Sequence, residues 1–251
     1  MDLINLKKLA EQLDLSVSTV SKAFRNSYDI SAKTRERVLA LAKELNYQPN
    51  PYASGLRTQK SKTIAVILPE IANNFFTQVI NGIEEVAQAK EYHVLIYLTH
   101  EDHDKEVAFI QHLQSGRVDG VLISISDGMK ENSHLDHLQK KGIPIVFFDR
   151  VDENIAATKV MTDNTESSYE ATKHLIEMGC KNVALLFFAR NLSVANQRRE
   201  GYLKAMHDYK LPVVEIPCHN DNKQDYEKIV KTLKKKNRPD GIFSAFEKLA
   251  M

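Results

Sequence analysis

The chain has 251 residues, 43% of them hydrophobic and 27% charged, which is typical of a soluble globular protein with one large domain or two smaller ones. Its 34 Lys and Arg against 33 Asp and Glu leave a net charge of +1, so the chain as a whole gives no sign of a polyanionic partner. Two cysteines exclude a disulfide framework and favour a reducing compartment. The sequence has no apolar run near the roughly 18 residues of a membrane span, and residues 1–15 lack the apolar stretch of a signal peptide. We therefore expect a cytoplasmic protein that does not enter a membrane.

The first 60 residues differ in charge from the rest. They hold ten Lys and Arg against six Asp and Glu, a net of +4, whereas the remainder of the chain carries −3. A basic segment before a mildly acidic body is typical of a DNA-binding module, although solvated helices often carry similar charge. The hydrophobic pattern has to decide between the two.

Three short helices are predicted in this basic segment. The first has an apolar face formed by Leu6, Leu9, Ala10 and Leu13. Ser16 is the expected N-cap of a second helix over 17–24, and Ser31 is that of a third. The third helix has a buried stripe formed by Val38, Leu41, Ala42 and Leu45. The second helix is expected to turn five side chains outward: Val17, Ser18, Ser21, Lys22 and Arg25. This pattern predicts a helix-turn-helix, with a protein-binding three-helix bundle as the alternative.

Residues 50–58 are predicted to be coil or helix depending on a partner. Asn50 and Pro51 can begin a helix, but residues 52–57 supply barely two turns, and Gly55 costs about 1 kcal/mol relative to Ala. Leu56 is either an apolar wedge that enters a base step from the minor groove or a linker residue that packs on the body.

From Lys62 onward, apolar runs alternate with amphipathic helices. The first series has predicted strands over 64–68, 93–98, 118–125 and 145–149, and helices over 74–90, 105–116 and 129–141. The second series has strands over 183–189, 213–216 and 242–244, and helices through 199–209 and over 225–236. Strand and helix alternating at this spacing predict an α/β body of parallel sheets with helices on both faces.

The two series repeat one another. Gly82-Ile83 recurs as Gly201-Tyr202, an offset of 119, and Arg117-Val118-Asp119-Gly120 recurs as Arg238-Pro239-Asp240-Gly241, an offset of 121. We therefore predict two similar lobes, with the chain crossing between them near 161–163. A strand equivalent to 143–149 would fall beyond Met251, so we expect an incomplete second lobe and a sequence that continues after this residue.

Two such lobes form a cleft, and ligands of parallel sheets collect at the carboxyl ends of strands. The strand-end segments are Pro69–Phe76, Asp149, Arg190–Arg199 and Glu247. Carboxylates with an arginine suit a hydroxyl-rich ligand, and Phe75 and Phe76 can stack on a ring. The alternatives are core packing for the two Phe and a structural ion pair between Asp149 and Arg198.

Signs of catalysis are missing from the sequence. The close histidine pairs His100/His103 and His134/His137 have no metal-ligand pattern beside them and are interpreted as solvated residues. The sequence contains no P-loop, dinucleotide fingerprint or nucleophile elbow. We therefore expect no enzyme activity, metal or cofactor.

Residues 4–58 resemble the DNA-binding head of the LacI/GalR family of bacterial regulators, and the resemblance extends through the body to the last residue. It is carried by NLKKLAE (5–11), SVSTVSK (16–22), SAKTRERV (31–38), LNYQPN (45–50) and the hinge residues Ala53 to Leu56. It implies an all-α helix-turn-helix head and hinge helix, followed by a periplasmic-binding-protein-like body of two parallel-sheet lobes. The implied domains are the head at 1–49, the hinge helix and linker at 50–61, the first lobe at 62–161 and the incomplete second lobe at 162–251.

The resemblance also assigns DNA-binding roles. Val17, Ser18 and Lys22 would read base edges, Ala53 would lie in the hinge, and Leu56 would be the minor-groove wedge. Phosphate contacts are implied for Asn5, Ser16, Thr19, Ser21, Ser31, Thr34 and Asn50. Two positions depart from the family: Asp14 replaces the usual Gly of the turn, and Arg25 replaces the usual Asn, which adds a charge near the DNA backbone and implies a less discriminating contact.

In the body, Asn73-Asn74-Phe75-Phe76 resembles the family's Asn-Pro-Phe-Phe segment, and residues 147–150 resemble its strand-end acid. The effector-binding residues it implies are Asn73, Phe75, Phe76, Asp149, Arg198 and Glu247. Phe246-Glu247 departs from the usual Asn-Asp, which retains the acid but loses the amide.

These observations predict a transcriptional repressor. It would bind an inverted-repeat operator in double-stranded DNA as a homodimer, under control of a small-molecule effector such as a sugar or related metabolite. One alternative is a two-lobe solute-binding protein, which would have an export signal and no basic head. The other is a sugar- or nucleoside-processing enzyme of the same fold, for which the sequence offers no catalytic pair.

Overall fold

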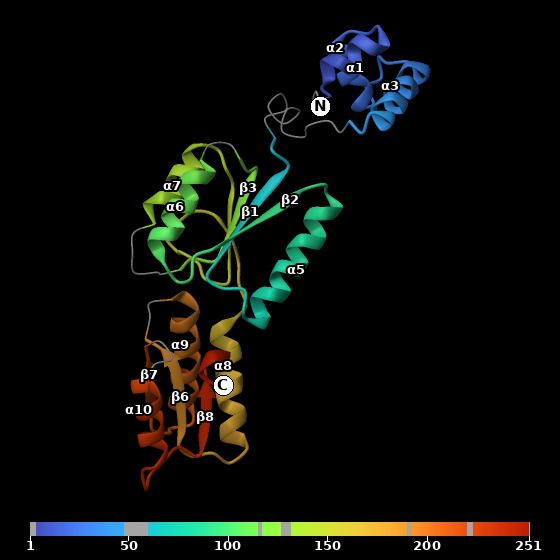
Figure 1. The fold of residues 1–251 in the computed structure, drawn as a ribbon. Helices are drawn as coiled ribbons and strands as arrows, with labels where there is room; N and C mark the ends of the chain where they lie inside the picture. The colour runs from blue at the N-terminus through green and yellow to red at the C-terminus, as the bar shows by residue number, and fades with distance from the viewer. Residues whose placement is uncertain are drawn as a thin grey trace. The chain divides into compact units, whose positions relative to one another are not determined.

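The computed structural model describes residues 4–47, 60–114, 117–126, 132–189, 192–219 and 223–250. Internal contacts divide the chain into two compact units, Met1–Ser61 and Lys62–Met251, here called the head and the body (Figure 1). The hinge residues Asn50, Ala53 and Leu56 lie outside the described residues, as does Arg190. No helix in the described ranges is long and apolar enough to cross a membrane.

The head consists of three helices, α1 (Leu6–Leu13), α2 (Val17–Phe24) and α3 (Ala32–Glu44), as predicted. Its small core is centred on Leu9, Val20 and Val38, which have no exposed surface. Asp14 ends α1 in the left-handed conformation, with φ 52° and ψ 47°. An aspartate therefore supplies the turn that glycine more often provides, because its short polar side chain tolerates this region.

The first lobe of the body is built on a five-stranded parallel sheet of order β2-β1-β3-β4-β5. Its strands are β1 (Thr63–Leu68), β2 (His93–Leu98), β3 (Gly120–Ile123), β4 (Ile145–Phe148) and β5 (Thr158–Val160). Its helices are α5 (Asn74–Ala89), α6 (His103–Leu113) and α7 (Ser133–Lys140).

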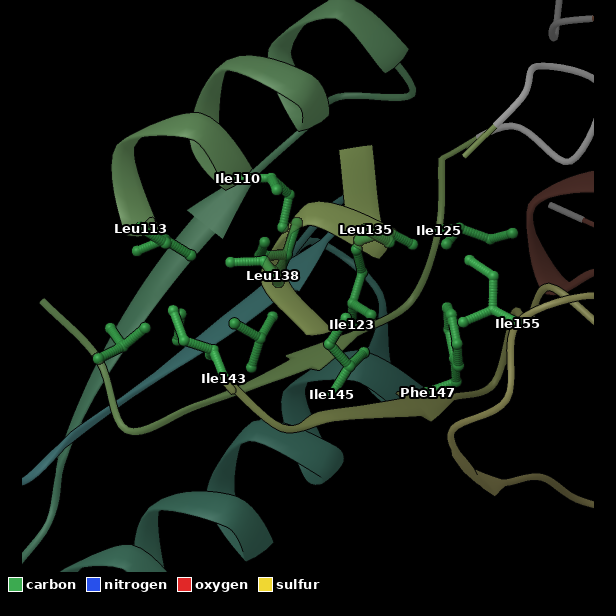
Figure 2. Packing of buried hydrophobic residues seen from close by; sticks show 14 of the residues in the cluster. Ile110, Leu113, Ile123, Ile125, Leu135, Leu138, Ile143, Ile145, Phe147 and Ile155 are labelled. Carbon is green, nitrogen blue, oxygen red and sulfur yellow. The ribbon is translucent and has the colours of Figure 1, made fainter. Parts of the chain in front are cut away.

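Helices cover both faces of this sheet. Ala65 and Ile67 of β1 pack with α6 and α7, whereas Val66 and Leu68 pack with α5. Figure 2 shows the larger cluster, in which Ile110 and Leu113 of α6 meet Leu135 and Leu138 of α7 over the strands. Burial on both faces explains why β1 reads as a continuous apolar run rather than an alternating one.

The second lobe repeats this plan on a three-stranded parallel sheet of order β7-β6-β8. Its strands are β6 (Val183–Phe188), β7 (Val214–Cys218) and β8 (Gly241–Ser244). Its helices are α8 (Asn164–Glu177), α9 (Ser193–Asp208) and α10 (Lys223–Leu233), followed by the short 3-10 helix η1 (Glu247–Leu249). Helices α8 and α9 cover one face of the sheet, and α10 packs on the other.

The repeated Asp-Gly pair has the same structural role in both lobes. Asp119 precedes β3, and its carboxylate accepts the Lys62 N–H just before β1 at 3.1 Å. Asp240 precedes β8 and accepts the N–H groups of Lys181 and Asn182, just before β6, at 2.9 and 2.8 Å. These backbone hydrogen bonds lower the pKa of the Asp240 carboxyl. Each aspartate thus ties the amino ends of two neighbouring strands together.

Strand β5 and helix α8 escaped the sequence analysis, as did the short η1. Strand β5 has three residues at the sheet edge and carries no apolar run. Helix α8 buries Asn164, Ser168 and Thr172, spaced four residues apart, so its inner face is small and polar rather than hydrophobic. Such a face gives no amphipathic signal.

Gly201 of α9 explains why the inner face of α8 is small. A Cβ atom built on Gly201 would lie 2.1 Å from the Thr165 carbonyl oxygen and 2.9 Å from the Ser168 Cβ. The backbones of the two helices therefore touch at this point, and only glycine fits. Gly82, its counterpart in the sequence repeat, has nothing within 4 Å of such an atom.

We predict that Gly201→Ala lowers the free energy of unfolding by about 2–3 kcal/mol, because backbone has to move to admit the methyl group. Gly82→Ala is the matched control and should raise stability by about 0.5–1 kcal/mol through helix propensity alone. Urea denaturation followed by circular dichroism measures both. Equal effects of the two substitutions would contradict the proposed contact between α8 and α9.

Candidate DNA-binding and effector sites

Three residues predicted to contact phosphates begin the three helices of the head. Asn5, Ser16 and Ser31 are the N-caps of α1, α2 and α3, and their side chains accept the N–H groups of Lys8, Thr19 and Thr34 at 3.0, 3.1 and 3.2 Å. The hydroxyls of Thr19 and Thr34 lie 2.9 and 2.8 Å from the capping serine hydroxyls. Helix N-termini carry partial positive charge and free N–H groups, so these are places where a phosphate can bind.

The outer face of α2 carries the predicted base-reading residues. Val17 and Ser18 are exposed, and Lys22 is partly exposed. The Lys22 ammonium forms an ion pair with Asp29 in the loop after α2, and this contact is the main cause that lowers the pKa of the Asp29 carboxyl. Because the ammonium has three N–H donors, the predicted base contact of Lys22 would either be shared with Asp29 or replace it.

Two further side chains lie near this surface, namely Arg25, which is exposed as predicted, and Tyr28. Arg25 folds back over α2, where its Nε donates to the Ser21 carbonyl at 3.2 Å and a terminal nitrogen reaches the Ser21 hydroxyl at 3.4 Å. Tyr28, which the sequence analysis missed, lies fully exposed beside Asp29. An exposed aromatic in a loop has no periodic pattern that would reveal it.

In the body, one cavity of about 280 Å³ brings together all six predicted effector-binding residues. Those residues are Asn73, Phe75, Phe76, Asp149, Arg198 and Glu247. The first four come from the first lobe and the last two from the second, so the cavity is a cleft between the lobes. The sequence analysis included Glu70, Arg150 and Phe246 only as members of longer segments, and it did not name three other lining residues, Glu101, Phe188 and Lys248.

Arg198 is anchored on the second-lobe side of the cleft. Its Nε donates to the Asn164 Oδ1 at 2.9 Å, and a terminal nitrogen donates to the Ala245 carbonyl at 2.6 Å. The guanidinium also lies 5.2 Å from the ring centroid of Phe246. Burial lowers the pKa of Arg198, and the nearby Asp149 carboxylate opposes that change. The remaining N–H groups of the guanidinium are available as donors.

Asp149 lies at the end of β4 in the left-handed conformation, with φ 58°. Burial raises the pKa of this carboxyl, while the positive charges of Arg150 and Arg198 oppose the rise. Its carboxylate is 3.9 Å from the Arg150 Nε, and Arg150 also donates to Glu101 at 2.8 Å. Asp149 therefore belongs to a charge network and does not form a simple pair with Arg198.

The two phenylalanines differ in role. Phe75 is 42% exposed and offers a ring to the cleft, whereas Phe76 is 3% exposed and packs in the core beside Phe148. Asn73 is the N-cap of α5, and its Oδ1 accepts the Phe75 N–H at 2.8 Å. Phe76 is therefore mainly a core residue, as the alternative interpretation expected, although it also lines the cavity.

Both units match models of one protein family. Residues 61–251 match periplasmic binding proteins and the sugar-binding domain of the LacI family, and residues 5–50 match the lacI family of bacterial regulatory proteins. The chain belongs to the LacI family. It is therefore a DNA-binding transcriptional regulator whose body is an effector-binding domain.

Individual relatives agree with this assignment. The sucrose operon repressor of Pediococcus pentosaceus is 32% identical over 255 residues, which cover 98% of this chain and 74% of that protein. The lac repressor dimer bound to operator and an anti-inducer has the same fold, with a TM-score of 0.84 at 21% identity over 99% of this chain and 76% of that one. The Cra regulator of Pseudomonas putida, solved with fructose 1-phosphate, matches 73% of this chain and 68% of its own, with a TM-score of 0.66 at 21% identity.

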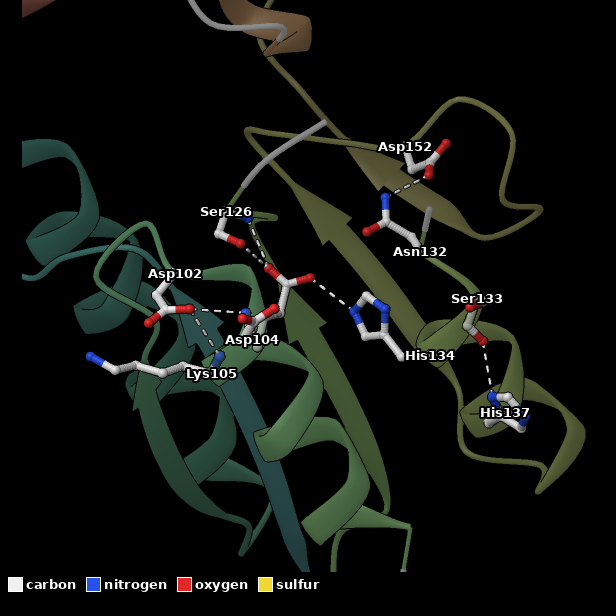
Figure 3. A network of polar contacts seen from close by, with 10 residues as sticks. Asp102, Asp104, Lys105, Ser126, Asn132, Ser133, His134, His137 and Asp152 are labelled. Carbon is white, nitrogen blue, oxygen red and sulfur yellow. Dashed lines mark hydrogen bonds and ion pairs between the residues drawn. The ribbon is translucent and has the colours of Figure 1, made fainter. Parts of the chain in front are cut away.

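A buried polar network in this LacI-family body corrects one interpretation of the histidines. His103 and His134 are buried, not solvated, and their rings meet edge to face at 5.1 Å. The fully buried Glu106 accepts the N–H and hydroxyl of Ser126 at 2.8 and 2.9 Å, and its other oxygen lies 3.0 Å from the His134 Nε2. Figure 3 shows His134 turned from α7 toward that carboxylate. His100 and His137 are exposed, as expected.

We predict that Glu106→Ala lowers the free energy of unfolding by about 3 kcal/mol, because it leaves the donors of Ser126 and His134 buried without an acceptor. Glu227→Ala, on the exposed side of α10, is the control and should change stability by less than about 0.5 kcal/mol. Chemical denaturation of both variants provides the measurement. Similar denaturation midpoints for Glu106→Ala and Glu227→Ala would show that the network does not stabilise the first lobe.

Proposed function

We propose that this regulator binds an inverted-repeat operator as a homodimer and represses transcription in the cytoplasm under the control of a sugar or related hydroxylated metabolite that occupies the cleft. The observation that carries the proposal is the presence in one chain of two sites. The head exposes a short helix between capped helix N-termini, and the body gathers charged and aromatic side chains in a cleft.

On DNA, α2 is the recognition helix. Its outer face is narrow and bears small or flexible side chains, which fits the major groove and lets Val17, Ser18 and Lys22 approach base edges. The N-termini capped by Ser16 and Ser31 supply phosphate contacts that fix its register. Because one such helix reads only a few base pairs, a symmetric pair of heads accounts better for specific binding.

The surface of the first lobe supports pairing with a second copy of the chain. Strand β2 is the sheet edge, and its Leu95 and Ile96 are partly exposed. Val86 of α5 is 58% exposed beside an apolar groove of about 520 Å³ between α5 and the sheet. An apolar edge of this kind is unfavourable in a monomer, and a second copy covers it while supplying the second head.

The cleft provides the effector control. A ligand that contacts both Asp149 and Arg198 touches both lobes and therefore prefers one separation of the lobes over others. It can change operator affinity only to the extent of that preference. The backbone N–H of Val151 donates to the Ser193 hydroxyl at 3.2 Å, a direct link between the lobes that a change in their separation would alter.

The two alternative functions are supported less well. A solute-binding protein would not need the head. Among the described cleft residues no serine, threonine or cysteine lies beside a general base, so covalent catalysis by such a nucleophile has no geometric support. We therefore propose that the protein is not an enzyme.

Lys22→Ala tests the recognition helix. It should weaken binding to the cognate operator by about 1–3 kcal/mol and relax the preference at one base pair of each half-site. Asp29→Asn is the matched variant. It releases Lys22 from its ion pair, and the operator should be bound at least as tightly as by the unaltered protein.

Operator selection from a random library, followed by gel-shift titration at fixed salt, measures both variants. If the unaltered protein selects no inverted repeat, the proposed function is wrong. If Lys22→Ala keeps full discrimination, only the role of Lys22 is wrong.

Val86→Asp tests the dimer surface, because a charge on the apolar face of α5 should oppose pairing. We expect the dissociation constant of the dimer to rise at least about tenfold, equivalent to roughly 1.4 kcal/mol. Val160→Asp on β5, at the opposite edge of the same sheet, alters an equally exposed valine (60%) and should leave pairing unchanged. Analytical ultracentrifugation measures the dissociation constants of the dimers of both variants. Equal dissociation constants would place the interface elsewhere.

A further inference from the structure

The charges that line the cleft are unevenly matched. Among its described lining residues, the acids are Glu70, Glu101, Asp149 and Glu247, and the bases are Arg150, Arg198 and Lys248. Which of these groups already have partners within the protein determines what kind of ligand the cleft can accept.

The two arginines are largely engaged. Arg150 is buried, pairs with Glu101 at 2.8 Å and faces Asp149 at 3.9 Å. Arg198 donates two hydrogen bonds, one to Asn164 and one to the Ala245 carbonyl. Its charge is further balanced by Asp149. Lys248 is exposed at the rim. Neighbouring carboxylates thus balance much of the buried positive charge, which reduces the attraction for an anion, although Arg198 keeps N–H donors that a ligand can use.

Two carboxylates are in the opposite situation. The side chains of Glu70 and Glu247 have no hydrogen bond or ion pair with any described residue, although both line the cavity. Glu70 is half-buried at the end of β1, and Glu247 is exposed at the start of η1. Ionised carboxylates only accept hydrogen bonds, so both require donors from a ligand or from water.

We propose that Glu247, assisted by Glu70, selects an effector that donates hydrogen bonds through hydroxyl or ammonium groups and excludes phosphate esters. The inference rests on the proposed effector function of the cleft. The phosphate group of an ester is mostly dianionic at neutral pH, so it repels the two carboxylates and gives them almost no donor, whereas a hydroxyl of a free sugar or the ammonium of an amino sugar in the same place satisfies them.

This selectivity separates the chain from a relative of the same fold. The Cra regulator was solved with fructose 1-phosphate, so the fold itself admits a phosphorylated sugar. Exclusion must therefore come from particular side chains of this chain. Glu247 is a candidate because its carboxylate lines the cleft and has no hydrogen-bond or ion-pair partner among the described residues.

Calorimetric titration of the full chain with matched compounds tests the proposal. The probes are ribose and ribose 5-phosphate; fructose and fructose 1-phosphate; sucrose and sucrose 6-phosphate; and glucose, glucosamine and glucose 6-phosphate. We expect at least one free or amino sugar to bind, with an affinity at least about tenfold above that of its phosphate ester.

Glu247→Gln should weaken binding of the preferred sugar about fivefold or more. It should also lower the ratio of the affinities of the sugar and its phosphate ester, because the substitution removes a negative charge but keeps a hydrogen-bond acceptor. Glu227→Gln on α10 removes the same charge away from the cleft and should change neither value. Circular dichroism confirms that both variants are folded.

Tighter binding of an ester than of its parent sugar, an unchanged ratio in Glu247→Gln, or binding of none of the free and amino sugars would each overturn the inference. Operator binding is measured on the same preparations. If an ester binds at least as tightly as its parent sugar and changes operator affinity, the selectivity is wrong but the proposed function stands. If the protein selects no operator, the proposed function itself fails.

Discussion

Helices α8 and α9 touch through their backbones at Gly201, and the second-lobe side of the cleft follows from this contact. Arg198 lies one turn before Gly201 on α9, and Asn164 begins α8 one turn before Ser168. Only when the helices approach this closely can the Arg198 Nε reach the Asn164 Oδ1 at 2.9 Å. Gly201 therefore affects the cleft without lining it, because the close approach of the two helices fixes the position of the Arg198 guanidinium.

Buried charge imposes a second constraint on the body. Asp149, Arg150 and Glu106 are each removed from water, and each is surrounded by hydrogen-bond partners or opposite charge. Desolvated charges are tolerated only in such surroundings. The carboxylates without partners lie where a ligand can reach them. Within the cleft, a charged side chain that has partners in the protein thus has a structural role, whereas one without such partners is available to a ligand.

The sequence predicted most of the architecture because most elements carry an apolar signal. Strands β1 and β6 are continuous apolar runs, and the three head helices have capping residues and hydrophobic stripes at helical spacing. The six predicted cleft residues also meet in one cavity, since the carboxyl ends of parallel strands converge.

What was missed depends on tertiary contacts. The buried side of α8 is Asn164, Ser168 and Thr172, a pattern that has meaning only opposite Gly201. His103 and His134 resemble surface histidines in sequence and become buried only when α6 and α7 pack together. The pairing of Lys22 with Asp29 spans a loop, and neither residue type indicates which partner it will find.

Lys62, the first residue of the body, is fixed on several sides. Its N–H donates to Asp119, its carbonyl accepts the His93 N–H at 2.8 Å, and its ammonium donates to the Lys90 carbonyl and lies 4.7 Å from the ring centroid of Tyr92. The linker to the head is thus mounted on a rigid point shared by three strands of the first lobe and the end of α5. Lys62 therefore moves together with the first lobe. A movement of the first lobe is therefore passed directly to the residue at which the linker joins the body.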